Sequence, residues 1–531
     1  MLKPAFINYE PVPLRFGTSG LRGNVADMTD LEVYINTLGY LRCLAAAGAP
    51  NGAGAVALAG DLRPSTQRIM RAAARAIADA GLTPENLGPL PTPALTYYAM
   101  SRARPGIMVT GSHIPFSMNG IKYVKPAGEV LKADEPGILA AVAEARAAEY
   151  AKTAAQTIFT AAGELKPAEQ QALPPAQAAA AEFYARRYLD VFPPGALQGM
   201  NILYYQHSAV GRNLLPSIIE RLGCRVHRAG RSEAFIAIDT EDITAAQLET
   251  LQALLNAESE KRGVQYDALI STDGDFARPQ VCGLERGTVK FFNGDLLGAV
   301  VAEYLKAGVA AVPVSANSAV AAHLASLGIE TISTRIGSPY VIAAMQEAAP
   351  RCPGKAIVSW EANGGFLTGT DLSINGKTLK ALPTRDALLP ILAVLAAARQ
   401  RNAALPALFS RLPKRYGKAG LLDNFPLETG RRILQRFSPA APAQEAAAFR
   451  ALEQFFSGEQ GFGRVTAINT VDGLRIFFAN GDIAHVRPSG NAPQLRIYAN
   501  ADTQARADEI VALCLREPAG ILRQLESAVT Q

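Results

Sequence analysis

The feature that most constrains the fold of this chain is a repeated alternation of short apolar runs with longer amphipathic runs. Val56–Ala59 is rich in strand-forming residues and precedes a helical pattern over Ser65–Ala80, and the same order returns at Asn201–Tyr205 and Asn213–Leu222. Such alternation is typical of α/β layers with parallel or mixed sheets. Further strands are expected at Ile107–Val109, Arg225–His227, Ala268–Ile270, Ala310–Val314 and Ala356–Ser359, and further helices at Asp295–Leu305, Ala319–Leu327 and Leu388–Ala398.

The length of 531 residues predicts several domains, because one domain usually holds about 100 to 200 residues. Ala140–Ala181 is rich in Ala, Glu, Lys and Gln and contains prolines, so it predicts helices and a linker. The chain ends in alternating strand patterns and a terminal helix, which predicts a smaller α+β domain. The expected segments are 1–180, 181–293, 294–409 and 410–531.

Charge and cysteine content exclude several classes of protein. Lys and Arg number 52 against 47 Asp and Glu, and a net charge of +5 on so large a chain indicates no nucleic-acid or membrane partner. The uncharged stretch 307–329 is broken by Pro313, Asn317 and His323, so no membrane span is expected. Five widely spaced cysteines without a CxxC pair indicate neither a disulfide framework nor a zinc site. We therefore expect a cytoplasmic protein.

A serine motif follows one of the expected strands. Thr110–Pro115, which reads TGSHIP, comes directly after the apolar run Gly106–Val109. Ligands of open α/β sheets bind at the carboxyl ends of strands, so Ser112 is a candidate nucleophile or phosphate carrier. Lys122 follows the nearby turn Asn119–Gly120 and is a candidate for the same site. An ordinary polar turn is the alternative.

An acidic loop follows another expected strand. Asp273 and Asp275 flank Gly274, and two carboxylates at this spacing can bend onto one Mg²⁺ or Ca²⁺ ion. The downstream acidic residues of an EF-hand are absent. An Asx turn remains the alternative interpretation.

A third motif, Trp360–Phe366, carries Glu361 and Asn363 on a loop with two glycines. A carboxylate and an amide can both hydrogen-bond to sugar hydroxyl groups, and Trp360 or Phe366 could support a sugar by apolar contact. A plain glycine-rich turn is the alternative.

The last motif, Arg487–Pro493, combines a guanidinium group, a hydroxyl, an amide and a glycine, with Arg496 shortly after it. These groups together can bind a phosphate dianion. A polar turn with solvated arginines is the alternative.

Taken in order, these motifs resemble those of the α-D-phosphohexomutase superfamily, in particular its bacterial phosphomannomutase/phosphoglucomutase members. The resemblance covers nearly the whole chain, and its motifs are FGTSGLRG (16–23), GDLRPS (60–65), PTPAL (91–95), TGSHIP (110–115), NGIK (119–122), DGDFAR (273–278), EANGG (361–365) and RPSGNAP (487–493). Their joint order and spacing are specific, although each motif is weak alone.

The resemblance implies three related α/β domains with mixed sheets and a smaller C-terminal α+β domain around a central cleft. It also implies a monomer or homodimer that acts on hexose phosphates. Ser112 would transfer its phosphoryl group to a hexose 1- or 6-phosphate, and the hexose 1,6-bisphosphate so formed would return the other phosphate.

The resemblance assigns roles to individual residues. Arg22, His113 and Lys122 would surround Ser112, with Lys122 as general acid/base. One Mg²⁺ ion per chain would be held by Ser112, Asp273 and Asp275. The substrate would be bound by Arg278, Glu361, Asn363, Arg487, Ser489, Gly490, Asn491 and Arg496.

The sequence departs from the family pattern at several of these motifs. The third Asp of the metal loop is replaced by Ala277, Asn363 stands where the family has Ser, and Asn491–Ala492 replaces Thr-Glu. The function that the resemblance implies is that of a phosphomannomutase/phosphoglucomutase. The alternatives are a phosphoglucosamine mutase and, because of Ala277, a weakly catalytic sugar-phosphate-binding homologue with a weakened Mg²⁺ site.

Overall fold

A computed structural model of the chain describes residues 4–17, 20–49, 54–241, 243–439, 441–489 and 493–530. The chain forms two compact units, which are described separately. The larger unit comprises Met1–Ala311 and Gly337–Phe409, and the smaller unit comprises Val312–Ile336 and Ser410–Gln531.

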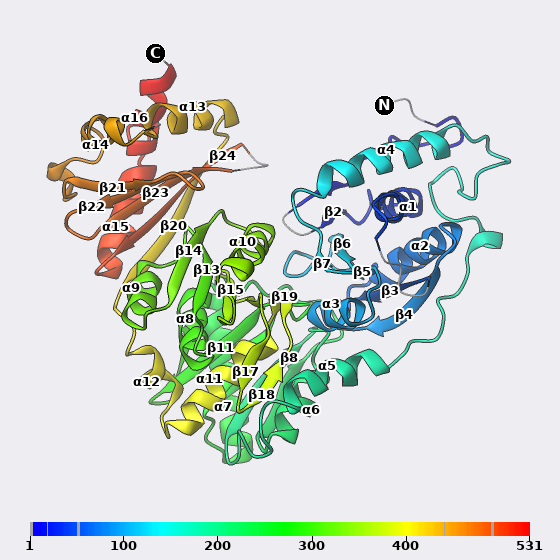
Figure 1. The fold of residues 1–531 in the computed structure, drawn as a ribbon, viewed down its shortest axis with the longest axis horizontal. Coiled ribbons are helices and arrows are strands. Elements are labelled where there is room, and N and C mark those ends of the chain that lie inside the picture. Colours follow the sequence, from blue (N-terminus) through cyan, green and yellow to red (C-terminus); the bar gives the residue numbers. More distant parts are fainter. Residues whose placement is uncertain are drawn as a thin grey trace. The chain divides into compact units, whose positions relative to one another are not determined.

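The first sheet of the larger unit is mixed (Figure 1). Strands β5 (Gly106–Val109), β3 (Ala55–Gly60) and β4 (Thr83–Pro89) run parallel, with β3 in the middle. Antiparallel pairing then joins β5 to β6 (Met118–Lys125) and β6 to β2 (Leu21–Asn24). Short strands complete the sheet, namely β1 (Arg15–Phe16) beside β2 and β7 (Gly128–Glu129) beside β6.

The helices of this region are α1 (Asp30–Ala46), α2 (Thr66–Asp79), α3 (Thr92–Ser101) and α4 (Glu135–Tyr150). Helix α2 shows why such segments fold as they do, because its buried residues Ile69, Ala73, Ala76 and Ile77 recur at helical spacing on one face. After Tyr150 the chain is mostly irregular until α5 (Ala179–Leu189), as the proline-containing linker predicts.

The second sheet is also mixed and has the order β12-β11-β10-β8-β9. Parallel pairs join β8 to β9 and to β10, and the other pairs are antiparallel. Its strands are β8 (Asn201–His207), β9 (Arg225–Arg231), β10 (Ala268–Thr272), β11 (Pro279–Glu285) and β12 (Thr288–Phe292), and the helices between them are α6 (Leu214–Arg221) and α7 (Ala245–Arg262).

A third sheet lies in the region that follows, and its strands β13, β15, β16 and β19 are neighbours in that order. Its strands are β13 (Val309–Pro313), β15 (Ile357–Trp360), β16 (Phe366–Thr368) and β19 (Leu382–Asp386), and β17 (Leu372–Ile374) pairs with β18 (Lys377–Leu379) as a separate hairpin. The helices are α8 (Gly294–Tyr304), α10 (Ser338–Arg351), α11 (Leu388–Gln400) and α12 (Leu405–Phe409).

The smaller unit contains an antiparallel sheet in the order β20-β24-β23-β22-β21. Its strands are β20 (Tyr416–Asp423), β21 (Val465–Asn469), β22 (Leu474–Phe478), β23 (Ile483–Pro488) and β24 (Gln494–Ala501). Its helices are α13 (Leu427–Phe437), α14 (Glu445–Glu453), α15 (Gln504–Leu515) and α16 (Ile521–Thr530), and the unit also includes α9 (Ser318–Ser326) and β14 (Glu330–Thr334) from the middle of the chain.

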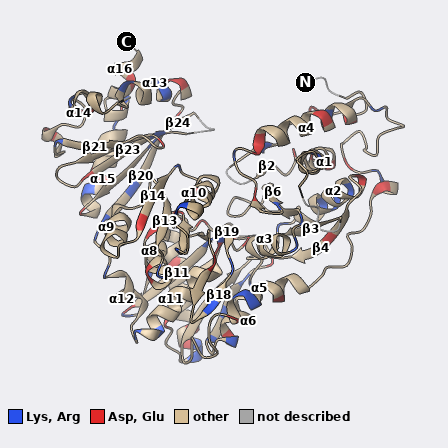
Figure 2. Cartoon of the chain, viewed as in Figure 1, with Lys and Arg blue, Asp and Glu red and all other residues tan. Residues whose placement is uncertain are grey.

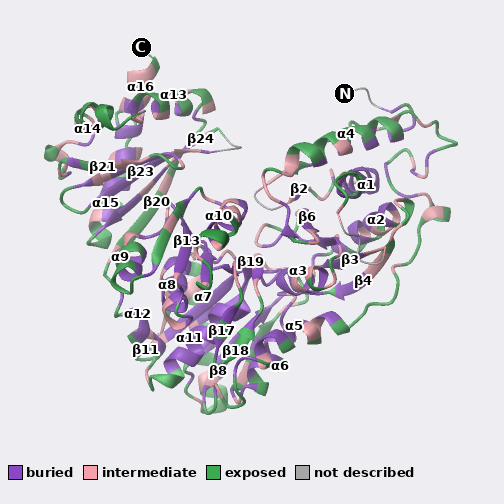
Figure 3. Cartoon of the chain, in the orientation of Figure 1, coloured by how far each residue is buried: buried purple, intermediate pink, exposed green. Residues whose placement is uncertain are grey.

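These sheets confirm the predicted α/β fold with mixed sheets and an α+β C-terminal region. Buried residues gather on the strands and on the faces of the helices that cover them (Figure 3). Acidic and basic residues are both distributed over the two units (Figure 2). Among the helices of the described residues, none is both long enough and apolar enough to cross a membrane.

Candidate active site

Ser112 lies on a tight loop at the carboxyl end of β5. Its φ angle is 57°, a left-handed conformation that costs free energy in a residue other than glycine. The Thr110 hydroxyl accepts a hydrogen bond from the Ser112 backbone N–H at 2.8 Å. The Ser112 hydroxyl donates to Asp273 Oδ2 at 2.7 Å. The fold thus brings the candidate nucleophile to the acidic loop.

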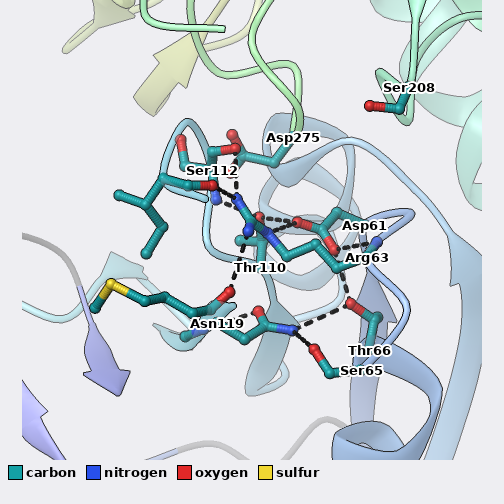
Figure 4. Close-up of polar contacts among 12 residues, drawn as sticks. Asp61, Arg63, Ser65, Thr66, Thr110, Ser112, Asn119, Ser208 and Asp275 are labelled. Atoms are coloured by element: carbon teal, nitrogen blue, oxygen red, sulfur yellow. Dashed lines mark hydrogen bonds and ion pairs between the residues drawn. The ribbon is translucent and has the colours of Figure 1, made fainter. Parts of the chain in front are cut away.

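The Arg63 side chain anchors the loop that carries Ser112 (Figure 4). Its side chain is buried and pairs with Asp61 at 3.1 Å, and Asp61 also accepts hydrogen bonds from the hydroxyl groups of Thr66 and Thr110. The Arg63 guanidinium donates to four backbone carbonyls of the loop, those of Ser112, Ile114, Pro115 and Met118. Several charge-assisted hydrogen bonds therefore fix the loop in one conformation.

Asp273 and Asp275 follow β10 and are fully buried. Asp275 Oδ2 accepts hydrogen bonds at 2.6 Å from both Lys122 Nζ and the Thr92 hydroxyl. Burial alone would raise the pKa of Asp275, but the Lys122 ammonium outweighs it and holds that pKa below its ordinary value. Burial and the negative charge of Asp275 raise the pKa of Asp273. Asp275 is thus paired closely with Lys122 at 2.6 Å, whereas the cation that faces Asp273, Arg278, lies farther away at 3.8 Å.

The acidic loop also fits a hard divalent cation. Asp275 Oδ1 is buried without a hydrogen-bond partner, and carboxylate oxygens are the ligands that Mg²⁺ prefers. Among the described residues no group of three or more His, Cys, Asp or Glu side chains could hold a metal ion. Ala277 contributes only its backbone N–H, which donates to Asp273 Oδ1 at 2.9 Å. The residues present therefore fit a cation held by two carboxylates rather than three.

Cationic side chains surround Ser112. Arg278 Nη1 lies 3.4 Å from Ser112 Oγ and 3.8 Å from Asp273 Oδ2, and it donates a hydrogen bond to His113 Nδ1. Burial, followed by the positive charges of Arg278 and Arg22, lowers the pKa of His113 to about 2, so this imidazole is neutral. Burial, Arg278 and Arg385 likewise lower the pKa of Arg22 to about 10. This excess of positive charge suits a bound phosphoryl group.

Glu361 and Asn363 lie on the loop after β15, and both are buried. Glu361 Oε2 forms an ion pair with Arg385 at 3.3 Å. Asn363 Oδ1 accepts a hydrogen bond from the Gly365 N–H at 3.0 Å, so the loop itself uses this amide oxygen. A Cβ atom on Gly365 would lie only 2.6 Å from Arg385 Cγ, so the glycine at this position allows the Arg385 side chain to pack against the loop.

The expected apolar support of a sugar by Trp360 or Phe366 is wrong. Both side chains are fully buried and stack on each other with ring centroids 5.8 Å apart. A Cβ atom on Gly298 would lie 2.2 Å from the Trp360 ring, so helix α8 closes over it. Both rings belong to the core between this helix and the sheet.

The motif predicted to bind phosphate lies in the smaller unit. Arg487 on β23 and Arg496 on β24 are directly opposite each other in the antiparallel register, so both side chains project from the same face. Arg487 Nε pairs with Asp472 at 3.0 Å, and Ser489 is buried. Gly490 and Asn491 lie outside the described residues.

Sequence reasoning assigned no role to several residues that the fold brings to this site. Thr92, Arg63 and Arg385 each contact a predicted site residue through a side chain. Thr92 lies in the motif PTPAL and Arg63 in the motif GDLRPS, and both motifs come at the ends of strands. Polar residues just after strand ends are candidates for a ligand site, so the same reasoning that selected Ser112 would have selected these two residues. Arg385 lies in β19 and has no such signal.

Comparisons with known proteins identify the family of the chain. Models of phosphoglucomutase/phosphomannomutase domains match three stretches, namely α/β/α domain I at 13–149, α/β/α domain III at 293–416 and the C-terminal domain at 435–516.

Individual relatives cover most of the chain. A phosphomannomutase of Sinorhizobium fredii is 38% identical over 94% of this chain and 97% of its own length. A phosphomannomutase of Salmonella muenchen is 36% identical over 94% of each chain. A phosphoglucosamine mutase of Sodalis glossinidius is 31% identical over 62% of this chain and 70% of its own. A solved phosphoglucomutase/phosphomannomutase family protein of Burkholderia thailandensis shares the fold, with a TM-score of 0.69, 18% identity and 97% of each chain covered.

Proposed function

The chain belongs to the phosphoglucomutase/phosphomannomutase family of the α-D-phosphohexomutase superfamily, and from this membership we propose that it interconverts hexose 1- and 6-phosphates. Mannose and glucose phosphates are the proposed substrates. The relatives named phosphomannomutase, at 36% and 38% identity over nearly the whole chain, support this choice.

One observation carries the proposed chemistry. The Ser112 hydroxyl lies between a carboxylate, Asp273 at 2.7 Å, and a guanidinium, Arg278 at 3.4 Å. In the first transfer the O–P bond of phosphorylated Ser112 breaks as a hexose hydroxyl oxygen forms a new O–P bond. The hexose hydroxyl loses a proton and Ser112 Oγ gains one. The second transfer reverses these changes at the other phosphate of the bisphosphate, which regenerates phosphoserine.

The side chains around Ser112 have distinct roles in this proposal. Arg278 and Arg22 stabilise the charge of the transferring phosphoryl group, and neutral His113 accepts the hydrogen bond that orients Arg278. Lys122 acts as the general acid/base and is anchored by Asp275. Mg²⁺, held by Asp273 and Asp275, supplies Lewis-acid neutralisation of phosphoryl oxygens when bound.

Substrate recognition divides between two motifs. Glu361 and Asn363 bind the hexose, and Arg487, Ser489, Gly490, Asn491 and Arg496 bind the phosphate that is not transferred. The direct register of Arg487 and Arg496 supports this role, because it places two cationic residues on one sheet face, where an anion can bind both of them, although Arg487 also pairs with Asp472.

A coupled assay tests the proposal. Mannose 1-phosphate, glucose 1-phosphate and glucosamine 1-phosphate are each supplied with the matching hexose 1,6-bisphosphate and Mg²⁺, and formation of the 6-phosphate is followed. We expect turnover of the mannose and glucose substrates, and loss of several orders of magnitude in Ser112→Ala. A preference for glucosamine 1-phosphate would instead identify a phosphoglucosamine mutase. Binding without turnover would identify the weakly catalytic homologue.

The predicted cytoplasmic location, the monomer or homodimer, and the absence of nucleic-acid and membrane partners stay predictions. Gel filtration with light scattering tests the oligomeric state directly.

A further inference from the structure

Thr92 begins helix α3 within the motif PTPAL, and the proposed function gives this motif no role. The Thr92 side chain is buried. A buried hydroxyl needs a hydrogen-bond partner, because burial without one costs free energy. The partner of Thr92 is the carboxylate of Asp275, 183 positions further along the chain. The fold thus joins the start of α3 to the acidic loop.

Two hydrogen bonds connect Thr92 with Asp275. The Thr92 hydroxyl donates to Asp275 Oδ2 at 2.6 Å, and the Thr92 backbone N–H donates to the Asp275 backbone carbonyl at 3.0 Å. The first N–H groups of a helix have no partner within the helix, so this one is available to the loop. Thr92 therefore fixes both the backbone of Asp275 and the direction of its carboxylate.

The two carboxylates of the acidic loop are held in different ways. Asp273 Oδ1 accepts hydrogen bonds from the backbone N–H groups of Ala277 and Arg278 at 2.9 and 3.0 Å, so the turn itself orients this side chain. The donors to Asp275 Oδ2 come from other elements, namely from the first residue of α3 and from β6. The orientation of Asp275 thus depends on residues outside its own loop.

Both of these donors bind the same oxygen of Asp275. The Thr92 hydroxyl and Lys122 Nζ each lie 2.6 Å from Oδ2, whereas Oδ1 is buried and has no hydrogen-bond partner. A buried polar atom without a partner costs free energy unless a bound species satisfies it. The arrangement therefore leaves Oδ1 as the oxygen that a hard cation can bind.

Lys122 alone does not keep this arrangement through the proposed reaction. As the general acid/base, Lys122 exchanges a proton with the hexose, and its hydrogen bond to Asp275 Oδ2 weakens whenever its amine is neutral. The Thr92 hydroxyl takes no part in the proposed proton transfer. Its hydrogen bond can therefore hold the carboxylate at every stage of the cycle.

We propose that Thr92 is a positioning residue for the Mg²⁺ site, because it holds the Asp275 carboxylate by Oδ2 and so presents Oδ1 to the cation. The orientation of this one carboxylate matters because Ala277 supplies no third carboxylate, and the site relies on two. The inference rests on the proposed function, since it takes Mg²⁺ as the cation of the acidic loop.

Metal binding by the full-length protein tests the inference without turnover. Thr92→Val removes the hydroxyl at nearly unchanged volume and leaves the backbone hydrogen bond in place. In calorimetric titration with Mg²⁺ we expect this variant to bind about tenfold to a hundredfold more weakly, the usual effect of removing a group that orients a metal ligand. Thr92→Ser keeps the hydroxyl and should restore most of the affinity. Thr92→Ala, which removes the hydroxyl with less bulk, should reproduce the loss.

The matched control is Thr96→Val on the next turn of α3. Thr96 is also buried, but its hydroxyl donates to the Thr92 backbone carbonyl at 3.0 Å and not to the acidic loop. This variant should bind Mg²⁺ as the wild type does. Melting temperatures in EDTA show that each variant is folded before its titration.

Three outcomes would overturn the inference. The first is a Mg²⁺ affinity within about twofold of wild type in Thr92→Val and Thr92→Ala. The second is an equal loss in Thr96→Val, because the effect would then come from the packing of α3. The third is a wild-type protein that binds no Mg²⁺. A wild-type protein whose Mg²⁺ binding depends on the Thr92 hydroxyl, but which turns over no hexose phosphate, would contradict only the proposed function.

Discussion

At the residue scale, a methyl group on Gly111 would meet the guanidinium group of Arg63. The Cβ atom would lie 2.6 Å from Arg63 Cζ, and Arg63 is itself held by Asp61 and by the carbonyls of the Ser112 loop. Gly111→Ala should therefore displace the loop and lower kcat by about tenfold or more, which corresponds to about 1.4 kcal/mol. Steady-state kinetics checks this, and unchanged kcat at unchanged thermal stability would contradict it.

Ala277 adjoins the two carboxylates of the proposed Mg²⁺ site and supplies no third carboxylate. In Ala277→Asp a third carboxylate joins a buried acidic pair, so the cation should be held more tightly and the metal-free protein should be less stable. We expect a lower Mg²⁺ concentration for half-maximal activity and a lower melting temperature in EDTA. Titration of both proteins with Mg²⁺ measures the first effect. A shift to higher Mg²⁺ would mean that the new side chain only crowds the loop.

At the scale of elements, the pairing of β23 with β24 sets Arg487 and Arg496, the arginines proposed to bind phosphate, directly opposite each other. Truncation of Arg487 or Arg496 to Ala removes a charge-assisted hydrogen bond of about 1.5 to 3 kcal/mol, which is roughly tenfold to a hundredfold in affinity. KM for hexose phosphates should rise accordingly. Arg436→Ala, at the end of α13, serves as a control outside the motif, and an unchanged KM in both truncations would exclude the assigned role.

His207 links the ends of β8 and β10, because its Nε2 hydrogen-bonds to the Thr272 carbonyl at 2.9 Å. Burial lowers its pKa from 6.5 to about 4. As the pH falls below about 6.5, His207 therefore takes up a proton in the unfolded state before it does so in the folded state. This difference lowers the free energy of unfolding by about 2 kcal/mol near pH 5. Urea unfolding at about pH 7 and pH 5 measures the decline. His207→Gln should lose less stability over this interval, and an equal loss would contradict the assignment.

At the scale of the whole molecule, the smaller unit is built from two separate segments of the chain, 312–336 and 410–531, because residues 337–409 between them belong to the larger unit. The apolar core of its antiparallel sheet comes from residues between Leu422 and Leu525. The earlier segment 312–336 is bonded to this region, because the Ser318 N–H donates to Asn500 Oδ1 and Arg475 donates to the Ala316 carbonyl. A fragment of residues 410–531 should therefore fold with reduced stability. A fragment of residues 1–409 should aggregate, because 312–336 loses its partners. Circular dichroism and light scattering check both outcomes, and an unfolded 410–531 fragment would show that 312–336 is indispensable to the sheet.

The sequence by itself determined the local features. Short apolar runs predicted β5, β10 and β15. Asp273 and Glu361 follow β10 and β15 directly, and Ser112 lies three residues after the end of β5. Strand ends can be read from the chain because they depend on neighbouring residues. The sequence also showed that Ala277 replaces an Asp, because the motif 273–278 can be compared directly with the family pattern.

The tertiary structure alone decided which side chains meet. The Ser112–Asp273 hydrogen bond joins residues 161 positions apart, and the Thr92–Asp275 bond spans 183 positions. The Glu361–Arg385 ion pair, the Thr240–Asn363 hydrogen bond and the burial of Trp360 under helix α8 likewise bring together residues from separate elements. No periodicity encodes such contacts, because they arise from the packing of separate elements whose arrangement is fixed only by the summed burial of apolar surface.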